Sequence, residues 1–148
     1  MRDSFKLLVI DDDQDDHEIF RGALDIAFPK AFCEFALDRA DAIKNLSDNK
    51  NVAPDYIFMD WNMPKMDAEE FMKQLRLLPD MQGVGVFVLS GSAPYVELEH
   101  LHALGVKKVL MKHKKTSTVC NAMNKKSRCQ SESFNCVVSS FNFAAIFL

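Results

Sequence analysis

The chain has 148 residues, of which 48% are hydrophobic and 26% are charged, a size and composition that are ordinary for one soluble globular domain. Its formal net charge of −3 is unevenly distributed, because residues 106–148 hold 8 of the 18 basic side chains and 1 of the 21 acidic ones. No aromatic pattern accompanies those basic residues, which argues against a nucleic-acid partner.

We expect neither a signal peptide nor a membrane anchor. The apolar run at residues 7–10 is too short for the first, and the interrupted apolar stretch at 137–148 is too short for the second. The lack of an apolar segment of membrane-spanning length also predicts no membrane partner. The four cysteines have no metal-ligand spacing and are too clustered for a disulfide framework, which indicates reduced thiols in a cytoplasmic protein. They are Cys33, Cys120, Cys129 and Cys136.

The first half of the chain alternates between two apolar patterns. A continuous apolar run predicts a strand at residues 5–10, and apolar residues at helical spacing predict a helix over 11–28 that Pro29 ends. A second strand is expected at 31–37 and a short helix at 39–46.

The second half continues the alternation. Strands are expected at residues 55–59, 85–90 and 107–111, and helices at 67–78 and 94–104. Strands that are nearly unbroken apolar runs, each followed by a helix, predict a parallel sheet that is buried on both faces. The predicted fold class is therefore α/β, with a doubly wound five-stranded parallel sheet and helices on both faces.

Carboxylates gather where two of these strands end. Asp11, Asp12 and Asp13 follow the first strand, and Asp60 follows the third. Ligands of such sheets bind outside the carboxyl ends of the strands, so these side chains should lie together. Carboxylates in close contact cannot all stay ionised without a cation, and oxygen ligands of this kind suit Mg²⁺. We therefore expect Mg²⁺ as the cofactor.

The fourth and fifth strands end differently, with Ser90 and Lys112. A metal ion and an ammonium group can neutralise phosphoryl oxygens while a nearby carboxylate attacks as a nucleophile. The combined set of side chains is therefore suited to phosphoryl transfer.

Four segments carry a resemblance to a known family, namely LLVIDDDQDD, YIFMDWNMPKMD, VFVLSGS and VLMK. In this order they resemble the receiver domain of two-component response regulators, and the similarity covers roughly residues 5–126. The resemblance implies a flavodoxin-like receiver fold, and we place the receiver domain at residues 1–126.

Carried over residue by residue, the resemblance makes Asp60 the phospho-accepting aspartate. Asp11 and Asp12 would be the acidic pair of the Mg²⁺ site, with Asp12 the more direct ligand. Asp60 and the backbone carbonyl of Asn62 would complete the metal ligands.

The resemblance also assigns the other two strand ends. Ser90 would hydrogen-bond the phosphoryl group, and Lys112 would form an ion pair with it. The donor would be a sensor histidine kinase or a phosphotransfer protein. A receiver is not an enzyme acting on other molecules, since it catalyses only its own phosphotransfer and dephosphorylation.

Other polar residues nearby are expected to have simpler roles. Asp13, Asp15 and Asp16 should be acids at a helix N-terminus, where the helix dipole favours them. His100 and His102 are two residues apart and cannot share a helix face, so we expect them at the surface.

The chain departs from the family at two positions near its fifth strand. His113 stands where receivers usually have a cis-proline, and a cis bond before His costs several kcal/mol more; the bond there is therefore trans or strained. Val109 stands where many receivers carry a Tyr or Phe that rotates on activation. The output would then depend on Ser90 and the surrounding backbone.

A last helix is expected to start near Thr116, and an apolar extension follows at residues 127–148. Two interpretations of this extension stay open. In one it packs on its own domain, and in the other it packs on a second copy of the chain in a homodimer. It is too short for a separate output domain, which favours a single-domain regulator that signals through a downstream protein.

Two other functions are consistent with parts of the sequence. One is a pseudo-receiver, a constitutive interaction module that keeps the fold without phosphorylation, and His113, Val109 and the tail favour it. The other is a hydrolase of the haloacid-dehalogenase type, which also uses an aspartyl nucleophile. It is disfavoured because Asp11 and Asp13 match its paired aspartates only inside an unbroken acidic run.

Overall fold

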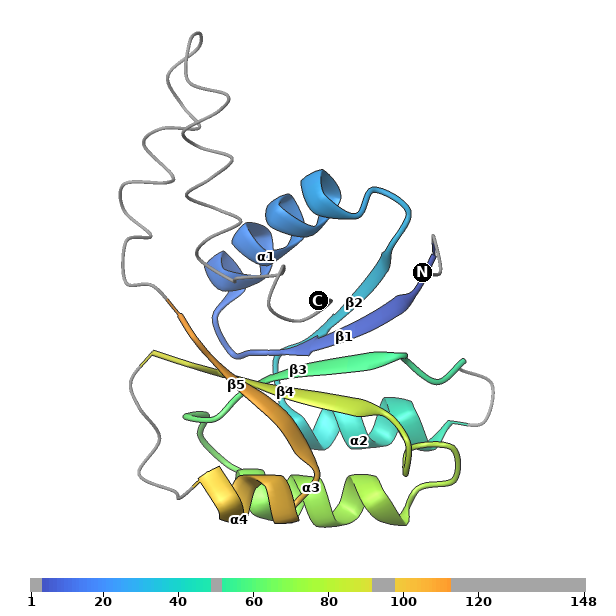
Figure 1. Cartoon of the computed structure of the whole chain (residues 1–148), viewed down its shortest axis with the longest axis vertical. Helices are drawn as coiled ribbons and strands as arrows, with labels where there is room; N and C mark the ends of the chain where they lie inside the picture. The colour runs from blue at the N-terminus through green and yellow to red at the C-terminus, as the bar shows by residue number, and fades with distance from the viewer. Residues whose placement is uncertain (1–3, 49–51, 92–97, 113–148) are drawn as a thin grey trace, which may run out of the picture.

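The computed structural model describes residues 4–48, 52–91 and 98–112. Five parallel strands form one sheet in the order β2-β1-β3-β4-β5, the order of flavodoxin-like folds (Figure 1). The predicted α/β fold class is confirmed. In chain order the elements are β1 (Lys6–Ile10), α1 (Gln14–Ala27), β2 (Phe32–Ala36), α2 (Arg39–Ser47), β3 (Tyr56–Asp60), α3 (Ala68–Leu77), β4 (Gly85–Ser90), α4 (Leu98–Ala103) and β5 (Val106–Met111).

Three of the helices begin at an aspartate cap. The carboxylate of Asp13 accepts a hydrogen bond from the backbone N–H of Asp15 at 2.9 Å, and Asp38 and Asp67 cap α2 and α3 in the same way. Such caps satisfy amides that have no partner within the first turn. The sequence predicted a helix from residue 11, and this start was wrong. Helix α1 begins at Gln14, after the cap residue Asp13, so Asp11 and Asp12 lie in the loop between β1 and α1.

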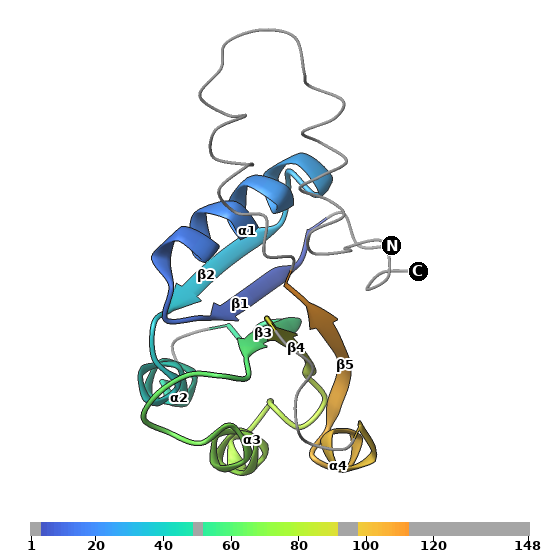
Figure 2. The same ribbon diagram turned by 90° about the vertical axis from the view of Figure 1, so that its left-hand side faces the viewer.

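The sheet buries both faces, and each face has its own core. Leu7 and Val9 of β1 belong to the core shared with α1, whereas Leu8 and Ile10 belong to the core shared with α2, α3 and α4. Figure 2 shows α1 on one side of the sheet and these three helices on the other. Successive side chains of a strand point to opposite faces. Two buried faces therefore explain why the strand sequences are continuously apolar.

At the amino ends of the strands, Arg76 of α3 connects several loops. Its guanidinium donates hydrogen bonds to the carbonyls of Met81, Gln82 and Val84 at 2.6, 3.2 and 3.2 Å, and to that of Gly105 at 3.1 Å. Gly105 has a φ of +92°, and a Cβ atom at this position would lie 2.8 Å from the guanidinium. Glycine is therefore required here for both its backbone conformation and its lack of a side chain.

The two edge strands of the sheet both carry charged side chains. On β2, Phe32 is exposed, and Glu34 forms an ion pair of 3.1 Å with Lys6 of the neighbouring strand. On β5, Lys107 and Lys108 are exposed. Each open edge of the sheet therefore presents at least one charge to the solvent.

Some of the sequence predictions fall outside the described residues. These are the character of the bond before His113, the helix near Thr116 and the extension at residues 127–148. The helix expected at residues 94–104 is described only from Leu98. Among residues 4–48, 52–91 and 98–112, no helix has the length and apolar character that crossing a bilayer requires.

Candidate functional site

The candidate site lies at the carboxyl ends of β1 and β3, the two strands at which the strand order reverses. Ile10 pairs with Met59 across these strands, and Asp11 and Asp60 are the next residues on each. Open α/β sheets bind their ligands in the crevice outside such a switch point. The two aspartates therefore stand where the fold favours a ligand.

Each of these two carboxylates has one oxygen fixed by the backbone. The N–H of Asp13 donates to Oδ1 of Asp11 at 3.0 Å, and the N–H of Asn62 donates to Oδ1 of Asp60 at 2.9 Å. In both cases the donor is the amide two residues further along the chain. The Oδ2 atoms of both carboxylates border a common space at the ends of the two strands.

Lys112 occupies that space. Its ammonium donates to Oδ2 of Asp11 at 2.5 Å, to Oδ2 of Asp60 at 2.8 Å and to Oδ2 of Asp16 at 2.8 Å. Its own backbone N–H donates to the carbonyl of Ser90 at 2.7 Å, which fixes the start of the segment after β5. One cation thus joins three carboxylates that lie 52 to 101 residues before it in the chain.

Burial and pairing act in opposite directions on these groups. Burial raises the pKa of Asp11, and its hydrogen bonds from Lys112 and from the backbone of Asp13 only partly offset that effect. Burial by itself lowers the pKa of Lys112, but the hydrogen bonds to the three carboxylates outweigh it and raise that pKa above its ordinary value. Lys112 is therefore a permanent cation at neutral pH.

Three carboxylates also form a candidate metal site. Asp11, Asp12 and Asp60 each offer an oxygen, and these oxygens lie within 4.8 Å of one another. Asp11 is buried and Asp12 is exposed, so the group is anchored in the protein and open to the solvent. Oxygen ligands gathered around a site that water can reach fit the coordination of Mg²⁺.

The sequence matches the response regulator receiver domain over residues 7–124. The chain belongs to the response regulator receiver family. Receiver domains are signalling domains of two-component systems. A comparison of the sequence with curated proteins finds no significant match.

Solved structures of receivers share the fold at low sequence identity. The phosphorylated cyanobacterial phytochrome response regulator RcpA is similar, with 24% identity, a TM-score of 0.67, and coverage of 80% of this chain and 88% of its own. The chemotaxis response regulator CheY4 of Vibrio cholerae has 22% identity, a TM-score of 0.64, and coverage of 81% and 96%.

A further neighbour holds a metal ion. The receiver domain of a sensor histidine kinase from Pseudomonas aeruginosa has 17% identity, a TM-score of 0.62, and coverage of 81% of this chain and 94% of its own. In that protein a magnesium ion is coordinated in the active-site cleft.

Two residues of this receiver's site were not predicted from the sequence. Asp16 lies in the first turn of α1, as expected of a helix N-terminal acid, but it also binds Lys112. Arg39, the first residue of α2, is 2% exposed and donates to carbonyls of the loop that follows Asp60. Both contacts join segments that are distant in the sequence, so no local pattern could have indicated them.

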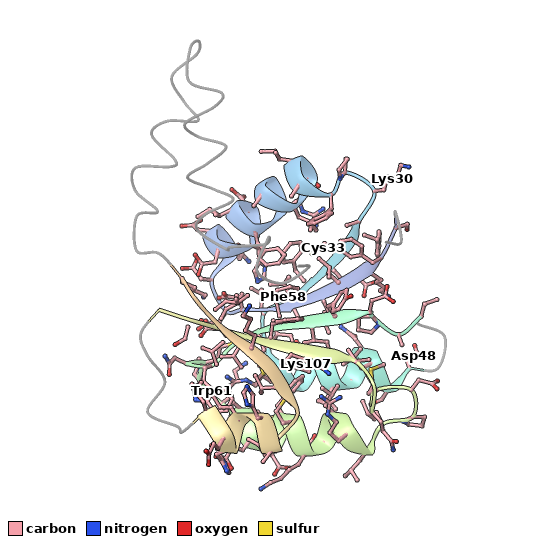
Figure 3. All side chains as sticks on the ribbon, viewed as in Figure 1. Lys30, Cys33, Asp48, Phe58, Trp61 and Lys107 are labelled. Atoms are coloured by element: carbon pink, nitrogen blue, oxygen red, sulfur yellow. The ribbon has the colours of Figure 1, made fainter. Side chains whose placement is uncertain are left out.

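The remaining predicted positions lie near the same strand ends. Ser90 ends β4 and is fully buried, and its neighbour Leu89 pairs with Asp60 across the sheet. Val109 is half-buried on β5 and packs against the core on the side of α2, α3 and α4. Trp61 directly follows Asp60 and packs against the same core (Figure 3). The only tryptophan of the chain is therefore next to the candidate phosphoacceptor.

His100 is exposed, as expected, and it has a specific partner. Its Nε2 atom lies 3.0 Å from a carboxylate oxygen of Glu69, which links α4 to the start of α3. The geometry supports a surface contact between helices and no role in the chemistry.

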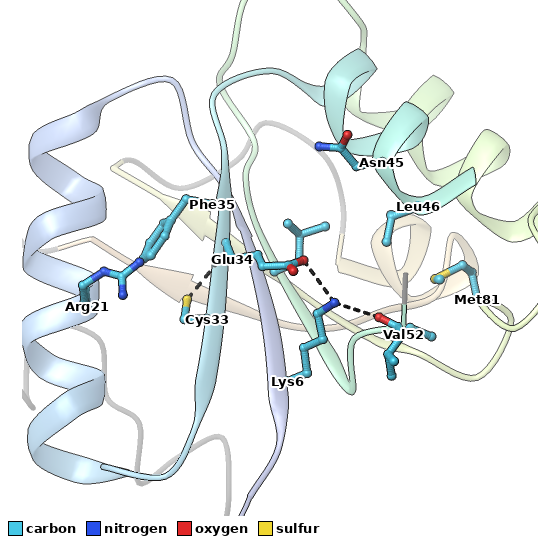
Figure 4. Close-up of a pocket in the computed structure, with 11 residues that line it drawn as sticks. Lys6, Arg21, Cys33, Glu34, Phe35, Asn45, Leu46, Val52 and Met81 are labelled. Atoms are coloured by element: carbon cyan, nitrogen blue, oxygen red, sulfur yellow. Dashed lines mark hydrogen bonds and ion pairs between the residues drawn. The ribbon is translucent and has the colours of Figure 1, made fainter. Parts of the chain in front are cut away.

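A cavity of about 420 Å³ lies away from these groups, around the open edge of β2 (Figure 4). Arg21 and Cys33 line it on the α1 side, and Lys6 reaches across it to Glu34 and to the carbonyl of Val52. Burial raises the pKa of the Cys33 thiol to about 12, so the thiolate needed for nucleophilic chemistry is scarce at neutral pH. None of the strand-end carboxylates lines this cavity.

Proposed function

We propose that this receiver accepts a phosphoryl group on Asp60 in a Mg²⁺-dependent reaction. The donor is the phosphohistidine of a sensor histidine kinase or of a phosphotransfer protein, and the reaction takes place in the cytoplasm. The observation that carries the proposal is the position of Asp60 Oδ2, which lies 2.8 Å from the Lys112 ammonium and beside the acidic pair.

The chemistry is an in-line displacement at phosphorus. A carboxylate oxygen of Asp60 attacks, the P–N bond to the donor imidazole breaks, and the electron pair of that bond returns to the imidazole nitrogen. Lys112 remains close enough to balance the negative charge of the incoming phosphoryl oxygens. Mg²⁺ held by Asp11, Asp12, Asp60 and the Asn62 carbonyl would supply further charge neutralisation on those oxygens.

Hydrolysis of the aspartyl phosphate ends the signal. Water attacks the phosphorus atom, the bond between phosphorus and the Asp60 oxygen breaks, and inorganic phosphate leaves while the carboxylate is restored. No output domain is needed for this cycle.

Phosphorylation replaces the single negative charge of the Asp60 carboxylate at the end of β3 by nearly two on the phosphoryl oxygens. These charges compete with Asp11 and Asp16 for Lys112 and attract the Ser90 hydroxyl at the end of β4. Because Val109 replaces the usual aromatic residue, we propose that the output passes through the β4–β5 face to a downstream protein. The extension at residues 127–148 would pack on this domain or on a second copy of the chain.

Substitution of the acceptor tests the proposal. Asp60→Asn should abolish labelling by a small phosphodonor such as acetyl phosphate in the presence of Mg²⁺, because the amide is no nucleophile. The matched control is Asp13→Asn, which makes the same change of charge at the same edge and keeps a good helix cap. Intact-protein mass spectrometry measures the labelled fraction. Undiminished labelling of the Asp60 variant would show that another residue is the acceptor.

One observation favours the pseudo-receiver alternative. Both carboxylate oxygens of Asp60 already have donors, Oδ1 from the Asn62 amide and Oδ2 from Lys112. A pseudo-receiver would keep this arrangement permanently. The fluorescence of Trp61 separates the alternatives, because a working site should respond to Mg²⁺ and again to beryllofluoride. A flat response in both steps would favour the constitutive interaction module.

A further inference from the structure

Arg39 is the one strongly buried cation of the described chain. It is 2% exposed, although it is the first residue of α2 and the next residue, Ala40, is exposed. Burying a guanidinium is costly unless its donors are satisfied, and burial lowers the pKa of Arg39 against the opposing effect of nearby carboxylates. The interactions that keep it there should therefore be strong.

Those hydrogen bonds are all made with the last residue of β3 and the loop that connects β3 to α3. One terminal nitrogen donates to the carbonyls of Asp60 and Trp61 at 2.7 and 2.8 Å. The other donates to the carbonyls of Met63 and Met66 at 3.4 and 2.6 Å. The guanidinium thus fixes both ends of the segment that begins at the phosphoacceptor.

The carbonyl of Asn62 is not among these acceptors, although those of both neighbouring residues are. It is the carbonyl that the proposed metal site requires. A loop clamped through Trp61 and Met63 has little freedom to turn the peptide between them, which leaves the Asn62 carbonyl in a defined orientation. Groups that orient a metal ligand in this way contribute strongly to metal affinity.

A planar guanidinium suits this contact better than an ammonium would. Four of its N–H groups can point to four separate carbonyls, whereas an ammonium is a compact point charge with three donors. The Nε–H of Arg39 has no acceptor among the described residues, so the hydrogen bonds to the loop are made by the two terminal nitrogens alone.

The charge of Arg39 acts in the opposite direction to its geometry. The carboxylates that interact with it most strongly are Asp60, then Asp67, then Asp12. A fixed cation beside two of the proposed metal ligands repels Mg²⁺. A substitution that keeps the positive charge but removes the planar guanidinium separates the positioning effect from this repulsion.

We propose that Arg39 is a positioning residue for the metal site, one that holds the loop after Asp60 so that the Asn62 carbonyl is preorganised for a divalent cation. The inference rests on the proposed Mg²⁺-dependent function. It assigns to Arg39 no contact with the phosphoryl group itself.

The test compares Arg39→Lys with Arg76→Lys. Both changes keep the charge and remove a guanidinium that binds four backbone carbonyls, but Arg76 lies at the opposite ends of the strands. Mg²⁺ titrations followed by Trp61 fluorescence give the dissociation constants. We expect Arg39→Lys to raise the dissociation constant by roughly tenfold and Arg76→Lys to change it by less than about twofold.

The Mg²⁺-dependent rise of the thermal unfolding midpoint provides a second readout that does not depend on the environment of Trp61. Ligand binding stabilises the folded state in proportion to the logarithm of ligand concentration over dissociation constant. The rise should be smaller in Arg39→Lys than in the wild type and unchanged in Arg76→Lys. If Arg39→Lys does not fold, Arg39→Gln takes its place, and there weaker Mg²⁺ binding is again expected.

Each outcome decides one question. A wild-type protein that does not bind Mg²⁺ contradicts the proposed function. A wild type that binds Mg²⁺, with Arg39→Lys and Arg76→Lys binding equally well, contradicts only the role of Arg39. Tighter binding by Arg39→Gln would also contradict it, since repulsion by the guanidinium would then outweigh its effect on the loop.

Discussion

At each end of the sheet a single arginine side chain binds backbone carbonyls, but the surroundings of the two arginines differ. At the amino ends of the strands, Arg76 binds four backbone carbonyls of the loops around β4 and β5. At the carboxyl ends, Arg39 binds the carbonyl of the last residue of β3 and three carbonyls of the loop that follows. Both side chains replace regular secondary structure as the hydrogen-bond partner of a loop.

The surroundings of the two guanidinium groups differ. Burial alone lowers the pKa of Arg76. The pKa of Arg39 is also lowered by burial, but carboxylates at four positions act against this effect. The carboxyl ends hold an excess of negative charge that a purely structural arrangement would avoid. The comparison therefore separates an end that maintains the fold from an end that is suited to chemistry.

The largest effect on stability is expected at the amino ends. Gly105→Ala should lower the free energy of unfolding by about 2 kcal/mol, because alanine is strained at φ +92° and its Cβ would displace the Arg76 guanidinium. Urea unfolding measures the change. The Mg²⁺ affinity of the folded protein should stay as in the wild type.

Gly83→Ala is the matched control at the same end of the sheet. A Cβ atom there meets nothing within 4 Å, so the substitution should leave the unfolding midpoint nearly unchanged. If both substitutions lowered the free energy of unfolding equally, glycine flexibility, and not the contact with Arg76, would determine the stability of this end.

A smaller effect is expected at the carboxyl ends at alkaline pH. The folded-state pKa of Lys112 is raised above the ordinary value of 10.5, so its stabilising contribution is complete below that pH and is lost as the pH rises through the folded value. The stability difference between the wild type and Lys112→Met should shrink by about 0.8 kcal/mol between pH 9 and pH 11. Urea unfolding across this range measures it, and a constant difference would show that the ammonium gains nothing from its three carboxylates.

The smallest effect concerns a second link between α2 and the loop after β3. Lys65 pairs with the capping carboxylate of Asp38, but its side chain is 74% exposed, so the ion pair is weak in water. Lys65 also has a φ of +72°, a conformation that asparagine tolerates. Lys65→Asn should therefore change neither the Mg²⁺ affinity nor the unfolding midpoint measurably. If Lys65→Asn weakened Mg²⁺ binding as much as Arg39→Lys, the exposed ion pair of Lys65, and not the buried contacts of Arg39, would position the loop.

The sequence predicted the fold well because its signals are local. Apolar runs such as that of β1 were long enough to place each strand to within one residue at either end. The parallel order then brought Asp11, Asp60 and Lys112 to one edge, and the geometry agrees.

The contacts that were missed depend on the tertiary structure. Arg39 stands at the start of a short helix among polar residues, where sequence alone predicts an exposed side chain. It is buried because a loop 21 to 27 residues further along the chain folds over it. Asp16 was correctly interpreted as a helix N-terminal acid, but its partner Lys112 is 96 residues away. The roles of Asn62 and Ser90, and the fate of the tail, stay predictions.

The charged edges of the sheet have a consequence for the behaviour of the protein in concentrated solution. An open strand edge can template the addition of a strand from another molecule, which is a common route to aggregation. Glu34 on β2 and the two lysines on β5 make such growth costly, since a docking strand would have to bury or displace a charge. The exposed Phe32 would favour growth, and the ion pair beside it limits that hazard. The charges on both edge strands therefore oppose aggregation by strand addition.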